Sequence, residues 1–295
     1  MLLMRFPILW VIDILNKVRD VKTLIRCRSV SKRFNSLATE SDSLLLQLDQ
    51  IGESDSEKDS AITSFFRSLF KSVNGFFPIF SKPAKILTPV KILAGFDQIR
   101  NLDVKFYGGD FKLEKGAAVK WKAEFGESLK SCVIVAFRSA TVNTLAIDGD
   151  AETDSEFVSG LKTRVVWTIS ALMAASTRHY QMRDLVKEHK EMEKLTVRDR
   201  DGEGAVARGD EKVSRERTVV PNVRMSMRNA PSLKLKSGIC LEAATLVVVR
   251  PSGVASDDED AELATGAFGF GDCMYGEAVA ALLKRRRNVL EMNSF

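Results

Sequence analysis

The side chains that most often perform chemistry are few in this chain and stand far apart. Its two histidines, His179 and His189, lie ten residues apart on a predicted helix beside basic residues, and we expect both on the surface. The four cysteines form no CxxC pair, so neither a zinc site nor a disulfide framework is expected: Cys27, Cys132, Cys240 and Cys273. Scattered thiols are typical of a reducing compartment, which predicts a location in the cytoplasm, the nucleus or both.

Two other patterns resemble sites but lack essential parts. Asp199, Asp201 and Gly202 begin like a calcium loop, yet the later ligands and the closing Glu are missing, which favours a solvated turn. The glycine-rich segment 266–271 has the wrong spacing for a dinucleotide-binding loop. The sequence therefore predicts no catalytic centre, no metal site and no bound cofactor, and we expect a protein that is not an enzyme.

The charged residues are numerous but nearly balanced, with 44 Lys and Arg against 39 Asp and Glu and a formal net charge of +5. They alternate in sign along most of the chain, so no nucleic-acid interface is expected. The acidic run 257–260 is interpreted as a solvated loop. A basic run has two interpretations, a nuclear-import patch or a complement to the dipole of the last helix, and it comprises Lys284, Arg285, Arg286 and Arg287.

The first fifteen residues are apolar enough to resemble a secretory signal peptide. Arg5, Pro7 and Asp13 interrupt this run, however, and no small-residue cleavage site follows it. A second apolar stretch, 165–175, is shorter than the ~20 residues that a helix needs to cross a bilayer. We therefore expect neither secretion nor a membrane span.

The spacing of apolar residues predicts an α+β protein in three parts, which span residues 1–45, 46–95 and 96–295. In the last part, alternation predicts strands, and a longer helical periodicity predicts one long helix. The expected strands cover 102–106, 119–125, 131–137, 223–228 and 241–249, with helices at 157–194 and 273–292 and polar loops at 198–217 and 251–266. This series indicates a mostly antiparallel sheet packed against one long helix.

The middle part, residues 46–95, is interpreted as a connector. A helix is expected over 44–51, and a polar, acidic linker follows at 52–61. The segment 63–80 contains six phenylalanines opposite Arg67 and Lys71, which predicts an amphipathic helix. This helix has two interpretations, packing on the larger domain or lying on a membrane surface.

The first part is expected to hold three short helices. Apolar residues recur at helical spacing through 11–18, Asp20 is placed to cap the next helix, and Ser29 is placed to cap a third. Three helices within about 35 residues are too small to bury a core of their own. The sequence therefore predicts a helical head whose apolar surface is covered by a partner.

Residues 6–38 resemble the F-box, whose pattern joins a proline, an Ile-Leu pair, a capped short helix and a V-[SC]-[KR]-x-[WF]-x-x-L ending. The matching positions are Pro7, Ile14, Leu15, Asp20, Leu24, Arg26, Cys27, Val30, Ser31, Lys32, Phe34 and Leu37. The resemblance implies a three-helix F-box that binds a Skp1-type adaptor, called ASK in plants, and through it a cullin. It implies adaptor contacts by Pro7, Ile14, Leu15, Leu24, Val30 and Phe34, with Ser31, Lys32 and Arg33 on the polar side.

Four longer segments, 21–51, 112–144, 163–180 and 282–295, resemble the plant auxin up-regulated F-box proteins. This likeness implies a substrate receptor of an SCF-type (Skp1-cullin-F-box) ubiquitin ligase, linked to auxin and cytokinin responses. An unidentified substrate protein would then be recruited by residues 96–295.

One departure from the F-box pattern leaves alternatives open. Ile8, Leu9 and Trp10 stand where F-boxes usually carry an acidic residue after the proline. One alternative is an F-box-like interaction protein outside any ligase, and another is a degenerate copy that binds the adaptor weakly. A third is a nucleic-acid or membrane-surface binder that uses 284–287 or the Phe-rich segment 63–80.

Overall fold

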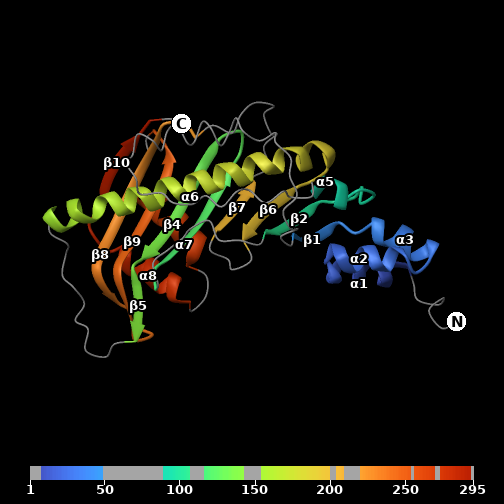
Figure 1. Cartoon of the computed structure of the whole chain (residues 1–295), viewed down its shortest axis with the longest axis horizontal. Helices are drawn as coiled ribbons and strands as arrows, with labels where there is room; N and C mark the ends of the chain where they lie inside the picture. The colour runs from blue at the N-terminus through green and yellow to red at the C-terminus, as the bar shows by residue number, and fades with distance from the viewer. Residues whose placement is uncertain are drawn as a thin grey trace, which may run out of the picture.

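The computed structural model of the chain describes residues 8–48, 89–106, 116–142, 154–199, 204–208, 220–253, 256–269 and 273–293. Its centre is one large sheet, which the long helix α6 (Asp154–Glu188) crosses on one face (Figure 1). A head of three helices extends from one end of this sheet: α1 (Ile8–Val18), α2 (Val21–Arg28) and α3 (Lys32–Thr39). The Phe-rich segment 63–80 lies outside the described residues.

Two of the head helices begin at side-chain caps. The Asp20 carboxylate accepts a hydrogen bond from the Thr23 amide at 2.9 Å, which confirms its expected role at the start of α2. The cap of α3 is Ser31, whose hydroxyl accepts from the Phe34 amide at 3.2 Å. The prediction that Ser29 caps α3 is wrong, because Ser29 has helical backbone angles and ends α2 instead.

The sheet has ten strands in the order β1-β2-β6-β7-β3-β4-β9-β8-β10, with β5 paired to β9. The strands are β1 (Ser43–Leu48), β2 (Asn101–Phe106), β3 (Ala118–Phe125), β4 (Leu129–Phe137), β5 (Ser139–Val142), β6 (Lys194–Asp199), β7 (Gly204–Arg208), β8 (Val223–Lys234), β9 (Ile239–Pro251) and β10 (Asn288–Met292). Six of the nine pairings are antiparallel and three are parallel. The sheet is therefore mixed but mostly antiparallel, and the predicted α+β class is confirmed.

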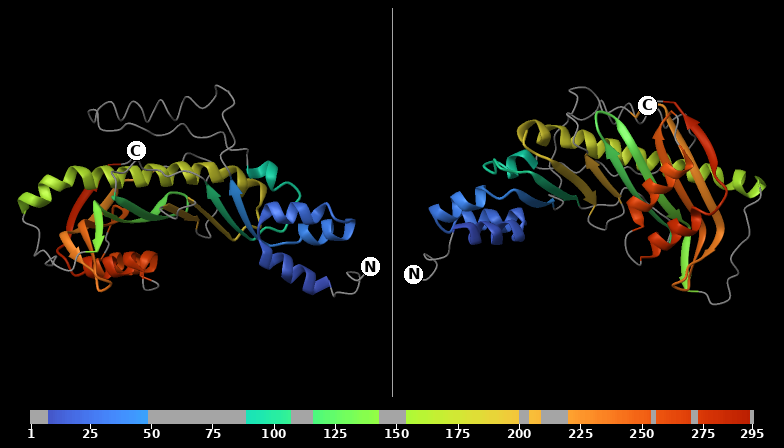
Figure 2. Two further views of the ribbon diagram at one scale, coloured as in Figure 1. Left: turned by 60° about the horizontal axis from the view of Figure 1, so that its bottom comes forward. Right: turned by 180° about the vertical axis from the view of Figure 1, so that it is seen from behind.

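Alternation along the strands determines which face each helix covers. Val104 of β2 and Val197 of β6 are paired in register and buried, and they join one apolar core with Leu172 of α6. A second core lies on the opposite face, where Val133 and Val135 pack with the helices α7 (Asp257–Phe268) and α8 (Met274–Leu282). Figure 2 shows α6 on one side of the sheet and α7 and α8 on the other.

The strands predicted from alternation are present, and so is the long helix, but it ends at Glu188 and not at residue 194, where β6 begins. The segment after the head also differs from prediction. The helix expected over 44–51 is wrong, because residues 43–48 form β1. Leu44, Leu46 and Leu48 are buried in strict alternation, and β1 pairs in parallel with β2. A run of leucines is compatible with a helix or a strand, and pairing with the edge of β2 stabilises the strand.

Three further segments differ from prediction. The expected loop 198–217 contains β7, which buries Val206 between β6 and β3. The expected loop 251–266 contains most of α7. The single helix expected over 273–292 is wrong, because α8 ends at Leu282 and β10 then adds to the edge of β8. In each case pairing or packing with a distant segment stabilises an element whose own pattern is weak.

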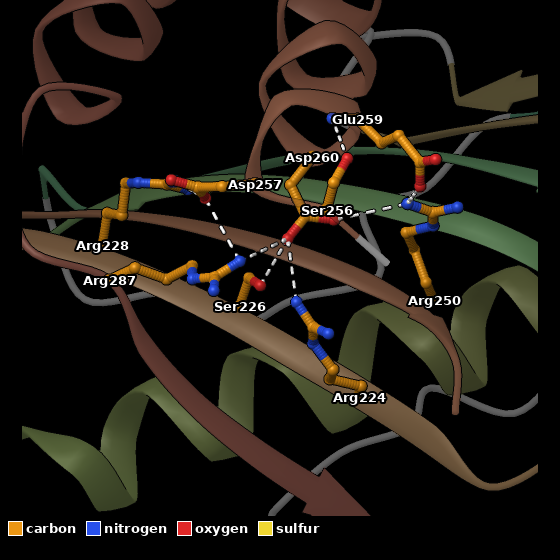
Figure 3. Close-up of polar contacts among 9 residues, drawn as sticks. All are labelled: Arg224, Ser226, Arg228, Arg250, Ser256, Asp257, Glu259, Asp260 and Arg287. Atoms are coloured by element: carbon orange, nitrogen blue, oxygen red, sulfur yellow. Dashed lines mark hydrogen bonds and ion pairs between the residues drawn. The ribbon is translucent and has the colours of Figure 1, made fainter. Parts of the chain in front are cut away.

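The acidic run 257–260, expected as a solvated loop, forms the first turn of α7. Ser256 caps this helix by accepting from the Glu259 amide, and acidic side chains favour a helix N-terminus. Asp260 is only 2% exposed and accepts a hydrogen bond from the Ser226 hydroxyl at 2.5 Å (Figure 3).

Arginines from β8, β9 and the turn before β10 surround this first turn of α7. The guanidinium groups of Arg224, Arg250 and Arg287 lie 3.7 to 3.8 Å from the Asp260 carboxylate (Figure 3). Arg250 also pairs with Glu259 at 2.6 Å, and this hydrogen bond and charge hold the pKa of the Glu259 carboxyl below its usual range. The network fixes α7 to β8, β9 and the turn before β10.

His179, expected on the surface, is buried on the side of α6 that packs against the sheet. Its ring stacks on Phe125 with the ring centroids 4.5 Å apart. The adjacent Arg178 lies 4.8 Å over the ring of Trp121 and pairs with the buried Asp199 at 3.5 Å. Asp199 is therefore an internal partner of the sheet and not part of a solvated turn.

Gly204 allows this packing because it carries no side chain. A Cβ at this position would lie 2.3 Å from the Trp121 ring, and the Gly204 amide donates to Asp199 at 2.6 Å. Gly266, on the exposed side of α7, has open space at its Cβ position.

Replacing Asp260 with Asn is expected to lower the free energy of unfolding by about 3 kcal/mol, because it leaves the surrounding arginines without their buried counter-charge. Urea denaturation measures this loss. The matched control is Asp258→Asn, at an exposed position of the same helical turn, which should change stability by less than about 0.5 kcal/mol. Equal losses of stability for the two substitutions would contradict the role of Asp260 as the buried counter-charge of these arginines.

Gly204→Ala is expected to destabilise the fold by about 1–3 kcal/mol, because the added methyl group overlaps Trp121. Gly266→Ala should instead stabilise it by about 0.5–1 kcal/mol, since alanine is the better helix former. Thermal unfolding followed by circular dichroism compares the two, and a stable Gly204→Ala protein would show that Trp121 is not held as described.

Candidate functional site

Among the described residues there are surfaces suited to binding a partner but no cluster of metal-binding side chains. They contain no group of three or more His, Cys, Asp or Glu side chains placed to hold a metal ion. All four cysteines are free, and burial raises the pKa of the Cys132 thiol far above its usual range, which keeps it protonated. No helix in these ranges has both the length and the unbroken apolar character needed to cross a bilayer.

Within the described ranges, the head carries most of the exposed large hydrophobic side chains. Of the ten large hydrophobic residues exposed in the described ranges, seven lie between residues 8 and 30: Ile8, Leu9, Trp10, Ile14, Val18, Ile25 and Val30. Leu9, Trp10 and Val30 are 77%, 67% and 70% exposed. We call these seven residues the apolar head surface. Such a concentration in one short region is typical of a protein–protein interface.

On α1 the exposed residues follow the helical repeat. Trp10, Ile14 and Val18 are spaced four residues apart, so they lie along one side of the helix. Leu15 faces away from this stripe and is buried in the core. An exposed ion pair between Asp13 and Lys17, 2.9 Å apart, lies beside the apolar stripe.

The turn between α2 and α3 adds a second exposed region. Val30 is held outward between the end of α2 and Ser31, the cap of α3. Lys32 and Arg33 are exposed in the first turn of α3, and Phe34 is half-buried behind them. This part of the head combines an apolar centre with a basic border.

The other side of the head is covered by the chain itself. Leu15, Val21, Leu24 and Leu37 belong to the same buried core as strands β1 and β2. The Leu45 amide also donates to the Arg19 carbonyl at 2.7 Å, which joins the start of α2 to β1. The head is therefore an extension of the sheet's core, and only its outer side needs a partner.

Arg28 makes a second attachment at the end of α2. Its guanidinium group donates to the Asn35 side chain at 2.8 Å and to the Ala94 carbonyl at 3.3 Å, and it lies 5.1 Å over the ring of Phe96. Gly95 has a φ of +84°, and a Cβ there would lie 2.9 Å from Arg28. These contacts hold α2 against the segment that leads into β2.

The structure separates the predicted adaptor contacts into two groups. Ile14, Val30, Ser31, Lys32 and Arg33 are exposed and Phe34 is half-buried, whereas Pro7 lies outside the described residues. Leu15 and Leu24 are buried, so in this structure they hold the helices in place and do not form the surface.

Sequence reasoning missed five members of the apolar head surface, namely Ile8, Leu9, Trp10, Val18 and Ile25. Their signal is present in the sequence. Apolar residues occupy more of α1 than the single stripe needed to pack on a core, and a helix that is apolar on most sides is covered on most sides. The departure from the F-box pattern at Ile8, Leu9 and Trp10 thus falls on exposed positions.

The basic run near the C-terminus is only partly available at the surface. Lys284 and Arg286 are exposed, but Arg287 pairs with Asp257 at 3.2 Å and lies 3.8 Å from Asp260. The run follows the end of α8, so a contribution to that helix dipole and a nuclear-import role both stay predictions.

Comparison with known proteins gives close relatives along nearly the whole chain. The chain is 73% identical to the F-box protein AUF1 of Arabidopsis thaliana, over 97% of both chains. It is 60% identical to the F-box protein AUF2 of the same plant, over 97% of this chain and 96% of the relative. A further F-box protein of Arabidopsis thaliana is 31% identical over 96% of this chain and 91% of its own length. No protein-family profile and no solved structure matches the chain.

The two groups of predicted contacts should respond differently to substitution. Leu24→Ala is expected to cost about 2–5 kcal/mol of stability because it opens a cavity in the shared core. Val30→Ala should change stability by less than about 0.5 kcal/mol, since Val30 is exposed. Urea denaturation of the full chain tests both, and a large loss for Val30→Ala would mean that it is packed and unavailable to a partner.

Proposed function

Because this chain belongs to the F-box protein family, together with AUF1 and AUF2, we propose that it is the substrate-recognition subunit of an SCF-type ubiquitin ligase. F-box adaptor proteins are non-catalytic. In the proposed role the head binds a Skp1-type adaptor and through it a cullin, while residues 96–295 hold a substrate protein. Ubiquitin is transferred from a cysteine of another subunit, so no reacting group is required in this chain.

The observation that carries this proposal is the apolar head surface. Fully burying a large apolar side chain is worth about 1.5–3 kcal/mol relative to leaving it in water, and seven such residues are gathered here. An adaptor that covers Trp10, Ile14 and Val30 would gain a buried apolar centre, with Lys32 and Arg33 at its polar border.

The attachment of the head to the sheet supports a tethering mechanism. The shared core and the contacts of Arg28 fix the head relative to the strands. A substrate bound on the α+β part is then held at a defined place relative to the adaptor. Tethering raises the effective concentration of the substrate near the ubiquitin-carrying subunit, and a rigid tether also restricts its orientation.

The biological setting that we propose rests on the resemblance to auxin up-regulated F-box proteins. We place the receptor in auxin- and cytokinin-related signalling, in the cytoplasm or nucleus.

A second candidate is a copy that binds the adaptor weakly or acts outside a ligase. It is favoured by Ile8, Leu9 and Trp10, which stand where F-boxes usually carry an acidic residue after the proline. The two candidates differ in whether a cullin is recovered with the chain.

The test is affinity capture of the full chain by a Skp1-type adaptor, with and without cullin. Trp10→Ser combined with Ile14→Ser should weaken capture about tenfold or more, because both residues are exposed centres of the proposed interface. The matched control is Val142→Ser, a surface substitution of an 84% exposed residue on β5 that should leave capture unchanged.

Point substitutions are preferable to deletion of residues 1–45, since deletion would remove part of the core shared with β1. Equal capture of the double variant and the wild type would contradict the proposed interface. Capture of adaptor without cullin would favour the second candidate, and failure of the wild type to bind adaptor would refute the ligase role.

A further inference from the structure

Within the described residues, helices cover one face of the sheet only in part. Helix α6 packs against β3, β4 and β7 on one face, whereas α7 and α8 on the other face contact β4, β8 and β9. Figure 2 shows α7 and α8 beneath one end of the sheet and the head at the opposite end. Between them, the side chains of β2, β6, β7 and β3 that point away from α6 remain partly exposed.

The strand register arranges these outward side chains in two rows across the strands. The first row contains Gln47, Lys105, Arg198, Ala205 and Lys122, from β1, β2, β6, β7 and β3. The second row contains Leu45, Asp103, Thr196, Ala207 and Glu124 from the same strands. Lys194 and Lys120 lie on the same face, one alternation further along β6 and β3. We call this set the open sheet face.

The open sheet face has an excess of positive charge. It carries five cationic side chains and two carboxylates, an excess of three. Arg198 forms an ion pair with Asp103, donating from Nε at 3.1 Å. Within the described ranges, neither Lys105 nor Lys122 has a carboxylate partner.

The two lysines of β3 are held as a pair of like charges. Lys122 donates to the Ala267 carbonyl and lies 5.2 Å from the Phe268 ring, while Lys120 lies 4.5 Å from the Tyr275 ring. Burial and the nearby charge of Lys120 lower the pKa of the Lys122 ammonium. An anionic group placed on this surface would relieve that repulsion.

The centre of the open sheet face carries short side chains. Ala205 and Ala207 on β7 lie between the longer side chains of Arg198 on one side and Lys122 and Glu124 on the other. Small residues at these positions let an incoming chain approach the sheet, while the cations at its borders reach toward acidic side chains. Because the receptor role proposed above concerns a protein substrate, an acidic protein segment is the ligand that we consider for this face, and a nucleic acid is the competing ligand in the test below.

We propose that the open sheet face recruits substrate by binding an acidic segment of a partner protein, with Lys105 and Lys122 as its main electrostatic contacts. The proposal rests on the receptor role described above and specifies the chemistry of the substrate. Because exposed charges are screened by salt, this binding weakens as ionic strength rises.

The test uses the full chain and a short fluorescent glutamate-rich peptide, with a peptide of the same length containing glutamine as comparison. Lys105→Glu combined with Lys122→Glu should weaken binding of the glutamate peptide about tenfold, through lost attraction and added repulsion. The matched control, Lys234→Glu combined with Lys236→Glu, makes the same charge change at exposed positions around the β8–β9 turn and should leave binding unchanged.

Three results would overturn the proposal: no preference of the wild type for the glutamate peptide, equal losses in the two double variants, or tighter binding of single-stranded RNA than of the peptide. Adaptor capture is measured on the same variants. Normal capture with lost peptide binding supports the proposal, whereas normal capture with unchanged peptide binding refutes the substrate site alone. Loss of capture by the wild type would instead refute the receptor role.

Discussion

The burial of four head residues in the core of the sheet is the constraint on which the rest of this structure depends. Leu15, Val21, Leu24 and Leu37 are covered by β1, β2 and their neighbours, so one side of each head helix faces inward. The apolar residues left on the outer side cannot also turn inward, since the short helices have no second core to enter. The same packing therefore makes the head rigid and leaves its outer side available to a partner.

The sheet serves both ends of the proposed mechanism. At its β1 edge it carries the head, and along its open face it presents charged side chains in register. Helix α6 crosses one face over β3, β4 and β7, and the arginine network around Asp260 fixes α7 on the other. A receptor that must hold two proteins in a defined relation benefits from such an undivided scaffold, because each added hinge would reduce the effective concentration gained by tethering.

Elements with a strong pattern of their own could be predicted from the sequence. Alternation identified the strands at 102–106 and 119–125, an apolar run identified β4, and the F-box-like spacing identified the head. Elements stabilised by distant partners could not. The leucines of β1 are compatible with either a helix or a strand, and pairing with β2 determines that they form a strand. Likewise, β10 is stabilised by pairing with the edge of β8. The buried state of His179 likewise depends on Phe125, which is 54 residues away in the sequence.

The central claim is that the outer side of the head is an adaptor interface on a rigid scaffold. Amide hydrogen exchange of the full chain, alone and with a Skp1-type adaptor, tests it most directly because protection is read segment by segment. The account predicts that adaptor slows exchange in α1 and in the turn between α2 and α3 and leaves β8 and β9 unchanged. Unchanged exchange throughout the head, or protection confined to the distant strands, would contradict it.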